Sequence, residues 1–87
     1  MSYQLVYTKR AFKDIRRLNE QQKRRIKKAL EDFRQAPFES PSLHKLANPE
    51  IGTYRLRVGD YRVILDIEAE RLIVLRVGHR KDIYRGV

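Results

Sequence analysis

Residues 53–84 read TYRLRVGDYRVILDIEAERLIVLRVGHRKDIY, and this stretch decides the fold. From Thr53 to Val58 the side chains alternate, with tyrosine, leucine and valine on one face and threonine and two arginines on the other. Gly59-Asp60 predicts a two-residue hairpin turn, because glycine at the first central position supplies the positive φ of a II′ turn. The turn places Arg57 opposite Arg62. Like charges directly opposite one another destabilise a sheet, so this pair indicates a site that holds a phosphate between two guanidinium groups.

A second turn, centred on Ala69-Glu70, completes three antiparallel strands over residues 53–58, 61–68 and 71–78. In this register Arg62 is opposite Val77. One face of the sheet is then expected to carry cations and an imidazole around an apolar floor: Arg55, Arg57, Arg62 and His79 around Ile64, Leu75 and Val77. Arg80 and Tyr84 follow just past the strand end, within reach of the same face, while Tyr54 and Tyr61 are expected to pack on the other face.

The N-terminal half predicts one strand and two helices. Residues 3–7 are typical of a short strand, and Thr8 can cap a first helix that ends before Asn19. A second helix is expected over residues 20–35, ended by Pro37. The two helices should bury stripes of apolar residues at helical spacing: Ala11, Phe12, Ile15 and Leu18, then Ile26, Ala29, Leu30 and Phe33.

Residues 37–52 contain all three prolines and predict a loop, in which Leu43 and Leu46 can tuck onto the core and His44 is expected to be structural or idle. The resulting order β-α-α-β-β-β predicts an α+β fold in which a two-helix hairpin packs on a mostly antiparallel four-stranded sheet. The chain of 87 residues is expected to form a single domain over residues 1–87.

The composition excludes several classes of protein. Cysteine is absent, the two histidines do not form a zinc motif, and no cofactor or metal is expected. No apolar run approaches a membrane span and no signal-like stretch follows Met1, so a cytoplasmic protein without membrane contact is expected. The net charge of +9 points to a polyanionic partner such as nucleic acid, or to an acidic protein.

Most of this charge lies in the helical half, residues 1–36, with a net charge of +7; five of its eleven cations form the run Lys23, Arg24, Arg25, Lys27 and Lys28. Two interpretations stay open for the run: the solvated face of an amphipathic helix, or a docking surface for an RNA backbone. The arginines of the sheet also have an ordinary alternative, because single surface arginines on strands are common. Three arginines that converge with His79 favour a functional site, since imidazole takes and gives protons near neutrality.

Two segments, Tyr54-Arg-Leu-Arg-Val-Gly-Asp-Tyr-Arg62 and Val77-Gly-His-Arg-Lys-Asp-Ile-Tyr84, resemble the RelE branch of the RelE/ParE toxin superfamily. The resemblance covers nearly the whole chain. It implies a toxin of a type II toxin–antitoxin pair, with a RelB-like acidic antitoxin, the ribosome and mRNA as partners. RelE-like toxins are ribosome-dependent endoribonucleases (mRNA interferases) that inhibit translation by cutting mRNA in the ribosomal A site.

The resemblance also implies roles for individual residues. Arg55 and Arg57 stand where the family often has catalytic lysines, and Arg62 matches its phosphate-binding arginine. Arg80 and Tyr84 match an arginine and a substrate-stacking tyrosine that follow the last strand, and Lys81 adds to the RNA-binding cations. Arginine stays protonated in proteins, so proton transfer in a metal-independent attack by the 2′-hydroxyl would fall to His79 or Tyr84.

Two other functions remain open. A ParE-type inhibitor of DNA gyrase has the same fold and no nuclease chemistry, and it would not need His79, Arg80 and Tyr84 beside the strand cations. A non-catalytic RNA-binding module is favoured by the cations of the second helix and disfavoured by the compactness of the candidate site.

Overall fold

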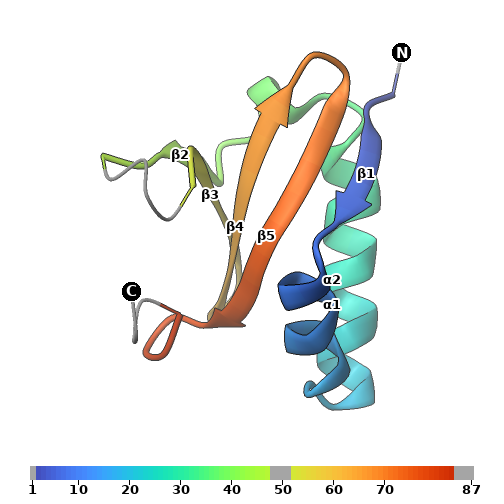
Figure 1. The fold of residues 1–87 in the computed structure, drawn as a ribbon, viewed down its shortest axis with the longest axis vertical. Helices are drawn as coiled ribbons and strands as arrows, with labels where there is room; N and C mark the ends of the chain where they lie inside the picture. The colour runs from blue at the N-terminus through green and yellow to red at the C-terminus, as the bar shows by residue number, and fades with distance from the viewer. Residues whose placement is uncertain (1, 48–51, 84–87) are drawn as a thin grey trace.

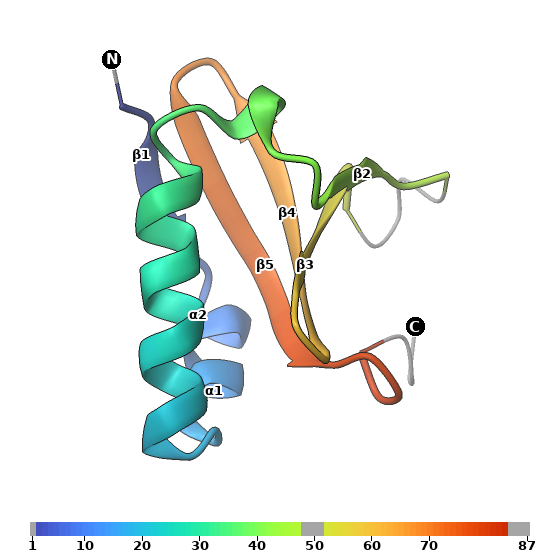
Figure 2. The ribbon, with the colours of Figure 1, turned by 180° about the vertical axis from the view of Figure 1, so that it is seen from behind.

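The computed structural model describes residues 2–47 and 52–83. In chain order the elements are β1 (Gln4–Tyr7), α1 (Lys9–Arg16), α2 (Glu20–Phe33), the short 3₁₀ helix η1 (Pro37–Glu39), β2 (Leu43–Lys45), β3 (Tyr54–Val58), β4 (Tyr61–Glu68) and β5 (Arg71–His79). The strands form a single sheet in the order β1-β5-β4-β3-β2, and only the β1–β5 pair is parallel. Figures 1 and 2 show both helices on the same side of this sheet. The α+β class and the helix pair on a mostly antiparallel sheet are therefore confirmed.

The sheet has five strands where the sequence predicts four. The extra strand, β2, lies inside the segment expected to be a loop and pairs with the free edge of β3. Its pairing satisfies backbone groups that β3 would otherwise leave open: Arg57 N–H donates to Ser42 O at 3.1 Å, and Leu46 N–H donates to Thr53 O at 2.8 Å. A three-residue strand between prolines has too little alternation to be recognised from its own sequence.

Both helices begin at the residues that the sequence indicates. The side-chain oxygen of Thr8 accepts from Ala11 N–H at 3.1 Å, and that of Asn19 accepts from Gln22 N–H at 2.8 Å. These caps satisfy amide groups that have no partner inside the helix. α2 ends at Phe33, two residues earlier than expected.

The core lies between the helices and one face of the sheet. The helices contribute Ala11, Ile15, Ile26, Leu30 and Phe33, and the strands contribute Leu56, Val58, Val63, Leu65, Leu72, Val74 and Val77. Tyr54 and Tyr61 pack against this cluster, as predicted. Phe12 was expected in the core, but 57% of it is exposed and the guanidinium of Arg16 lies 5.9 Å from its ring centre. The buried stripe of α1 is therefore narrower than the apolar pattern of its sequence predicts, because it does not include Phe12.

The first hairpin has the predicted register, with Arg57 opposite Arg62 and a φ of +60° at Gly59. The second hairpin turns at Ala69-Glu70 as predicted, with Ala69 itself in the left-handed region at φ +53°. Its register then shifts by one residue between Ile64 and Leu65, so that Arg62 lies opposite Gly78 and not opposite Val77. Because side chains alternate along a strand, every residue of β5 after this β-bulge lies on the face opposite to the predicted one.

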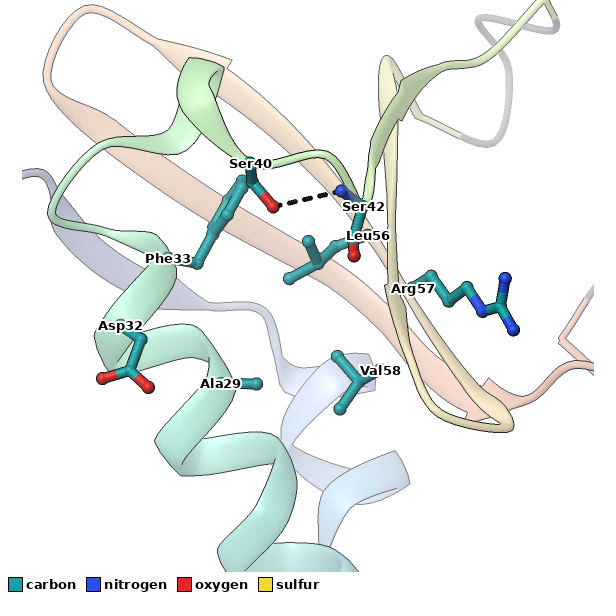
Figure 3. Close-up of a pocket in the computed structure, with 8 residues that line it drawn as sticks. All are labelled: Ala29, Asp32, Phe33, Ser40, Ser42, Leu56, Arg57 and Val58. Atoms are coloured by element: carbon teal, nitrogen blue, oxygen red, sulfur yellow. Dashed lines mark hydrogen bonds between the residues drawn. The ribbon is translucent and has the colours of Figure 1, made fainter.

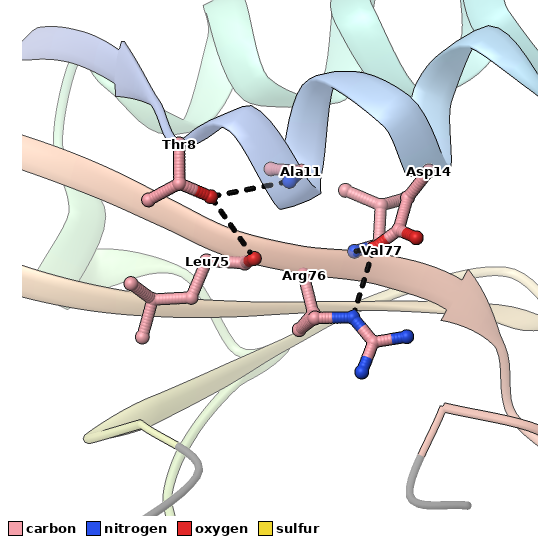
Figure 4. Close-up of polar contacts among 6 residues, drawn as sticks. All are labelled: Thr8, Ala11, Asp14, Leu75, Arg76 and Val77. Carbon is pink, nitrogen blue, oxygen red and sulfur yellow. Dashed lines mark hydrogen bonds and ion pairs between the residues drawn. The ribbon is translucent and has the colours of Figure 1, made fainter. Parts of the chain in front are cut away.

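The bulge occurs where α1 replaces β1 along the edge of β5 (Figure 4). Thr8 N–H donates to Val74 O at 3.1 Å and the Thr8 hydroxyl donates to Leu75 O at 3.2 Å. Beyond that point the Asp14 carboxylate accepts from Val77 N–H at 3.0 Å and from Nε of Arg76 at 3.0 Å. The edge of β5 is thus completed by side chains of α1, and Val77 joins the core.

Candidate functional site

The arginine face is the side of the sheet that the helices leave uncovered, and it carries Arg55, Arg57 and Arg62. Arg55 and Arg57 alternate along β3 with Leu56 and Val58, which are buried. Figure 3 shows Leu56 and Val58 on the side of α2, and Arg57 pointing away from that side. The sequence-predicted placement of all three arginines on one face is confirmed.

The three arginines have different surroundings. Arg62 is half-buried, and its Nη1 donates to the carbonyl oxygens of Gly59 and Tyr61, both at 2.9 Å. Arg55 is also half-buried, opposite Ile64. Arg57 is exposed, and within residues 2–47 and 52–83 its side chain makes no hydrogen bond or ion pair. The guanidinium of Arg57 is therefore available to an anion, while Nη1 of Arg62 is held at the turn.

An apolar floor lies under the arginine face, but its members differ from the predicted set. Ile64 is 1% exposed and contacts the backbone at Gly52, where an added Cβ would lie 2.5 Å from Ile64 and 3.1 Å from the Leu75 side chain. Ile83 is 2% exposed and packs on Gly78. The floor thus consists of Ile64, Leu75 and Ile83, and the bulge has moved Val77 to the core. Through Ile83, the chain that follows β5 crosses onto the arginine face.

Four charged side chains surround the β3–β4 turn. Arg80 N–H donates to Asp60 O at 2.8 Å, and Nε of Arg80 lies 3.7 Å from the Asp60 carboxylate. From α2, the guanidinium of Arg25 lies so close to Gly59 that an added Cβ would be 2.5 Å from its Nη2. Arg62 reaches the same turn from β4. Glycine suits this position because of the positive φ at Gly59, and the guanidinium of Arg25 lies over its Cα.

His79 does not share the arginine face. After the bulge it lies opposite Tyr61, on the side of the sheet that bears the helices, and the two rings meet edge to face at 5.5 Å between centres. Its Nδ1 accepts from Lys81 N–H at 3.2 Å, so the proton of the neutral ring is on Nε2. The prediction that His79 points with Arg62 is wrong, because it assumed a hairpin without a bulge. Tyr84 lies outside the described residues.

The cations of α2 lie on the opposite side of the sheet from the arginine face. Lys23 forms an ion pair with Glu20 at 3.3 Å, and Lys28 forms one with Asp32 at 3.1 Å. Arg24 and Lys27 are exposed. Arg25 therefore extends the α2 cations to the β3–β4 turn, where Arg62 also reaches.

Two polar residues near the arginine face had no assigned role in the sequence. Arg76 lies opposite Ile64 and is neutralised by Asp14. His44, expected to be structural or idle in a loop, is in β2 directly opposite Arg55. The bulge brings Arg76 to this face and the short strand brings His44, and neither feature has a local sequence signal.

A groove between α2, η1 and β3 has a volume of about 250 Å³ and meets the arginine face only at Arg57 (Figure 3). It is lined by Ala29, Asp32, Phe33, Ser40, Ser42, Leu56, Arg57 and Val58.

In the part of the chain that is described, no three His, Cys, Asp or Glu side chains are grouped as metal ligands. No described helix is long and apolar enough to cross a membrane.

A pair of helices on one face of a small, mostly antiparallel sheet is a fold that this chain shares with the toxins of known toxin–antitoxin complexes. The toxin–antitoxin complex RelBE of Mycobacterium tuberculosis contains a chain that superimposes with a TM-score of 0.80 at 25% identity, over 92% of this chain and 100% of that one. A RelB–RelE complex of Methanococcus jannaschii gives a TM-score of 0.72 at 27% identity, over 91% and 94% of the two chains. The RelE–RelB complex of Pyrococcus horikoshii gives 0.76 at 24% identity, over 94% and 99%.

The sequence itself matches a family model over residues 5–84, described as the ParE toxin of type II toxin–antitoxin systems. The chain belongs to this family and is a toxin of a toxin–antitoxin system with the RelE/ParE fold. No curated protein sequence gives a significant match. The resemblance to the superfamily that the sequence indicates is confirmed.

Proposed function

We propose that this toxin is an endoribonuclease that cuts mRNA in the ribosomal A site. The observation that carries the proposal is the arginine face, where Arg57 lies directly opposite Arg62 and next to Arg55. Facing guanidinium groups weaken a sheet, and their convergence on an uncovered face fits the binding of an anionic substrate. RNA supplies this substrate as a phosphodiester with an adjacent 2′-hydroxyl.

In the proposed reaction the 2′-oxygen attacks the neighbouring phosphorus and the bond to the 5′-oxygen breaks, which produces a 2′,3′-cyclic phosphate and a 5′-hydroxyl. Arg55, Arg57 and Arg62 would hold the phosphate and stabilise the charge that develops on its oxygens. Arg80, positioned at the β3–β4 turn, would contact a neighbouring phosphate. Two groups are candidates for the proton transfer: Tyr84, assigned from the sequence, and His44, which the structure adds. His79, also assigned from the sequence, lies on the other side of the sheet and is not one of them.

The partners of the proposed toxin follow from its charge and its relatives. Similar structures are complexes with RelB-type antitoxins. An acidic antitoxin of this type would be complementary to a chain of net charge +9. The exposed cations Arg24, Lys27 and Lys81 would contact the RNA backbone or the ribosome, together with Arg25 and with Lys23 and Lys28 once these leave their carboxylate partners.

A second candidate is inhibition of DNA gyrase, which is favoured by the family model, since that model describes the ParE toxin. A gyrase inhibitor needs a binding surface and no proton-transfer group. The proposed nuclease and this inhibitor therefore make different demands on the arginine face.

Mapping of mRNA 5′ ends after induction of the toxin in cells separates the two functions. New 5′ ends inside translated frames support the nuclease, whereas DNA damage without such ends supports gyrase inhibition. Purified toxin on programmed ribosomes should cleave in a chemical step that does not need magnesium. A magnesium requirement in that step, once the ribosome is assembled, would contradict the mechanism.

A further inference from the structure

We infer that His44, and not His79, is the imidazole that accepts the 2′-hydroxyl proton on the arginine face. The inference rests on the proposed nuclease function. It starts from β2, the edge strand that the sequence does not predict and that Figure 2 shows beside β3.

The register places His44 among the arginines. β2 and β3 are antiparallel with His44 opposite Arg55, and the pair lies between two backbone hydrogen bonds, Arg57 N–H to Ser42 O and Leu46 N–H to Thr53 O. Directly opposite residues share a face, with their Cβ atoms about 4.5–5.5 Å apart. Arg57 is the diagonal neighbour of His44 on the same face, at about 7–8 Å, which is within reach of a long side chain. A phosphate bound between Arg55 and Arg57 would lie next to the imidazole.

The imidazole of His44 is free to react. The residue is exposed, and nowhere in residues 2–47 and 52–83 does its side chain make a hydrogen bond, ion pair or ring contact. His79 differs in each respect, because it is half-buried, its ring packs on Tyr61, and its Nδ1 accepts from Lys81 N–H. Its position on the other side of the sheet also separates it from Arg57.

The role of His44 in the reaction is to accept one proton. The neutral imidazole of His44 takes the proton of the 2′-hydroxyl as the 2′-oxygen forms its bond to phosphorus. The bond from phosphorus to the 5′-oxygen breaks, and the leaving oxygen takes a proton from water. The imidazolium then returns its proton to water. Arginine cannot do this work, since it stays protonated, and so a face with Arg55, Arg57 and Arg62 needs one group of another kind.

The test is single-turnover cleavage of mRNA on programmed ribosomes by wild type, His44→Ala, His44→Gln and His79→Ala. Both His44 variants should cleave about 10²–10⁴-fold more slowly, the usual contribution of a general base. His79→Ala, the matched control for loss of an imidazole, should cleave at the wild-type rate. Ribosome binding and the thermal midpoint of the His44 variants should equal those of wild type, because the residue is exposed and has no described partner.

The pH profile excludes a merely structural role. The wild-type rate should rise with pH and then level off, as in a reaction that needs a neutral imidazole, and the His44 variants should lose this rise. Added free imidazole should restore part of the His44→Ala rate. A wild-type pH profile in the His44 variants, or a wild-type rate, overturns the inference while the nuclease function stands. If the wild-type protein cuts no mRNA, both the proposed nuclease function and the inference about His44 are refuted.

Discussion

Replacement of Arg62 by alanine is expected to lower the free energy of unfolding as well as the rate of RNA cleavage. Nη1 of Arg62 donates to the carbonyl oxygens of Gly59 and Tyr61. Each such hydrogen bond contributes about 0.5–1.5 kcal/mol, so that the pair contributes about 1–3 kcal/mol. In a domain of this size that loss lowers the thermal midpoint by about 4–24 °C. A domain of this length has about 4–13 kcal/mol of stability, so the variant should remain folded at room temperature.

Arg57→Ala is the matched control, because Arg57 faces Arg62 across the same strand pair and is exposed. Its side chain has no partner among the described residues, so its removal should change the free energy of unfolding by no more than about 0.5 kcal/mol. Each variant loses one charge-assisted contact to the phosphate, of about 1.5–3 kcal/mol, which corresponds to a cleavage rate about 10–10²-fold lower.

The free energy of unfolding is measured by urea unfolding monitored with circular dichroism. The cleavage rate is measured in single turnover on programmed ribosomes. An Arg62→Ala variant as stable as wild type would refute the role of Arg62 in the turn. A strongly destabilised Arg57→Ala variant would show that the arginine face is structural. Cleavage at the wild-type rate by both variants would show that the scissile phosphate does not bind at the arginine face.

Three further outcomes are expected. Asp14→Ala should lower the free energy of unfolding in urea by about 2–4 kcal/mol, because a carboxylate only 9% exposed pairs with Arg76 and Val77 N–H. Asp14→Asn keeps an acceptor for Val77 N–H and should recover part of the lost free energy of unfolding. An Asp14→Asn variant as unstable as Asp14→Ala would contradict this. Burial, and then the nearby Glu31, raises the pKa of Tyr7 above its ordinary value of 10. Its stabilising contribution is therefore complete below about pH 10 and is lost as the pH rises through the folded-state pKa, so thermal midpoints of Tyr7→Phe should fall less steeply in that range than those of wild type. Equal slopes would refute this role of Tyr7. Finally, antitoxin affinity measured by calorimetry should fall as salt is added, because an acidic antitoxin is proposed for a chain of net charge +9. An affinity independent of ionic strength would indicate a mainly apolar interface.

The candidate site shows how far local patterns reach. Arg55, Arg57 and Arg62 were placed correctly because strict alternation and a glycine turn act within ten residues. His79 was placed on the wrong face, although its strand and its turn were both predicted. One extra residue in β5 was enough to reverse it.

The position of that bulge depends on segments far apart in the chain. The edge of β5 is completed by β1 as far as Val74 and by Thr8 and Asp14 beyond it, and only the packing of α1 determines where one replaces the other. The same holds for β2, which is a strand only because β3 offers an open edge.

The sequence by itself determined the helix caps, the hairpin at Gly59-Asp60, the α+β class and the side of β3 on which its arginines lie. Each of these depends on contacts within a few residues, where side-chain type dictates backbone geometry. Tertiary structure alone decided which other residues meet those arginines, because that depends on pairing between distant strands. It turned His79 toward Tyr61 and brought His44 beside Arg55.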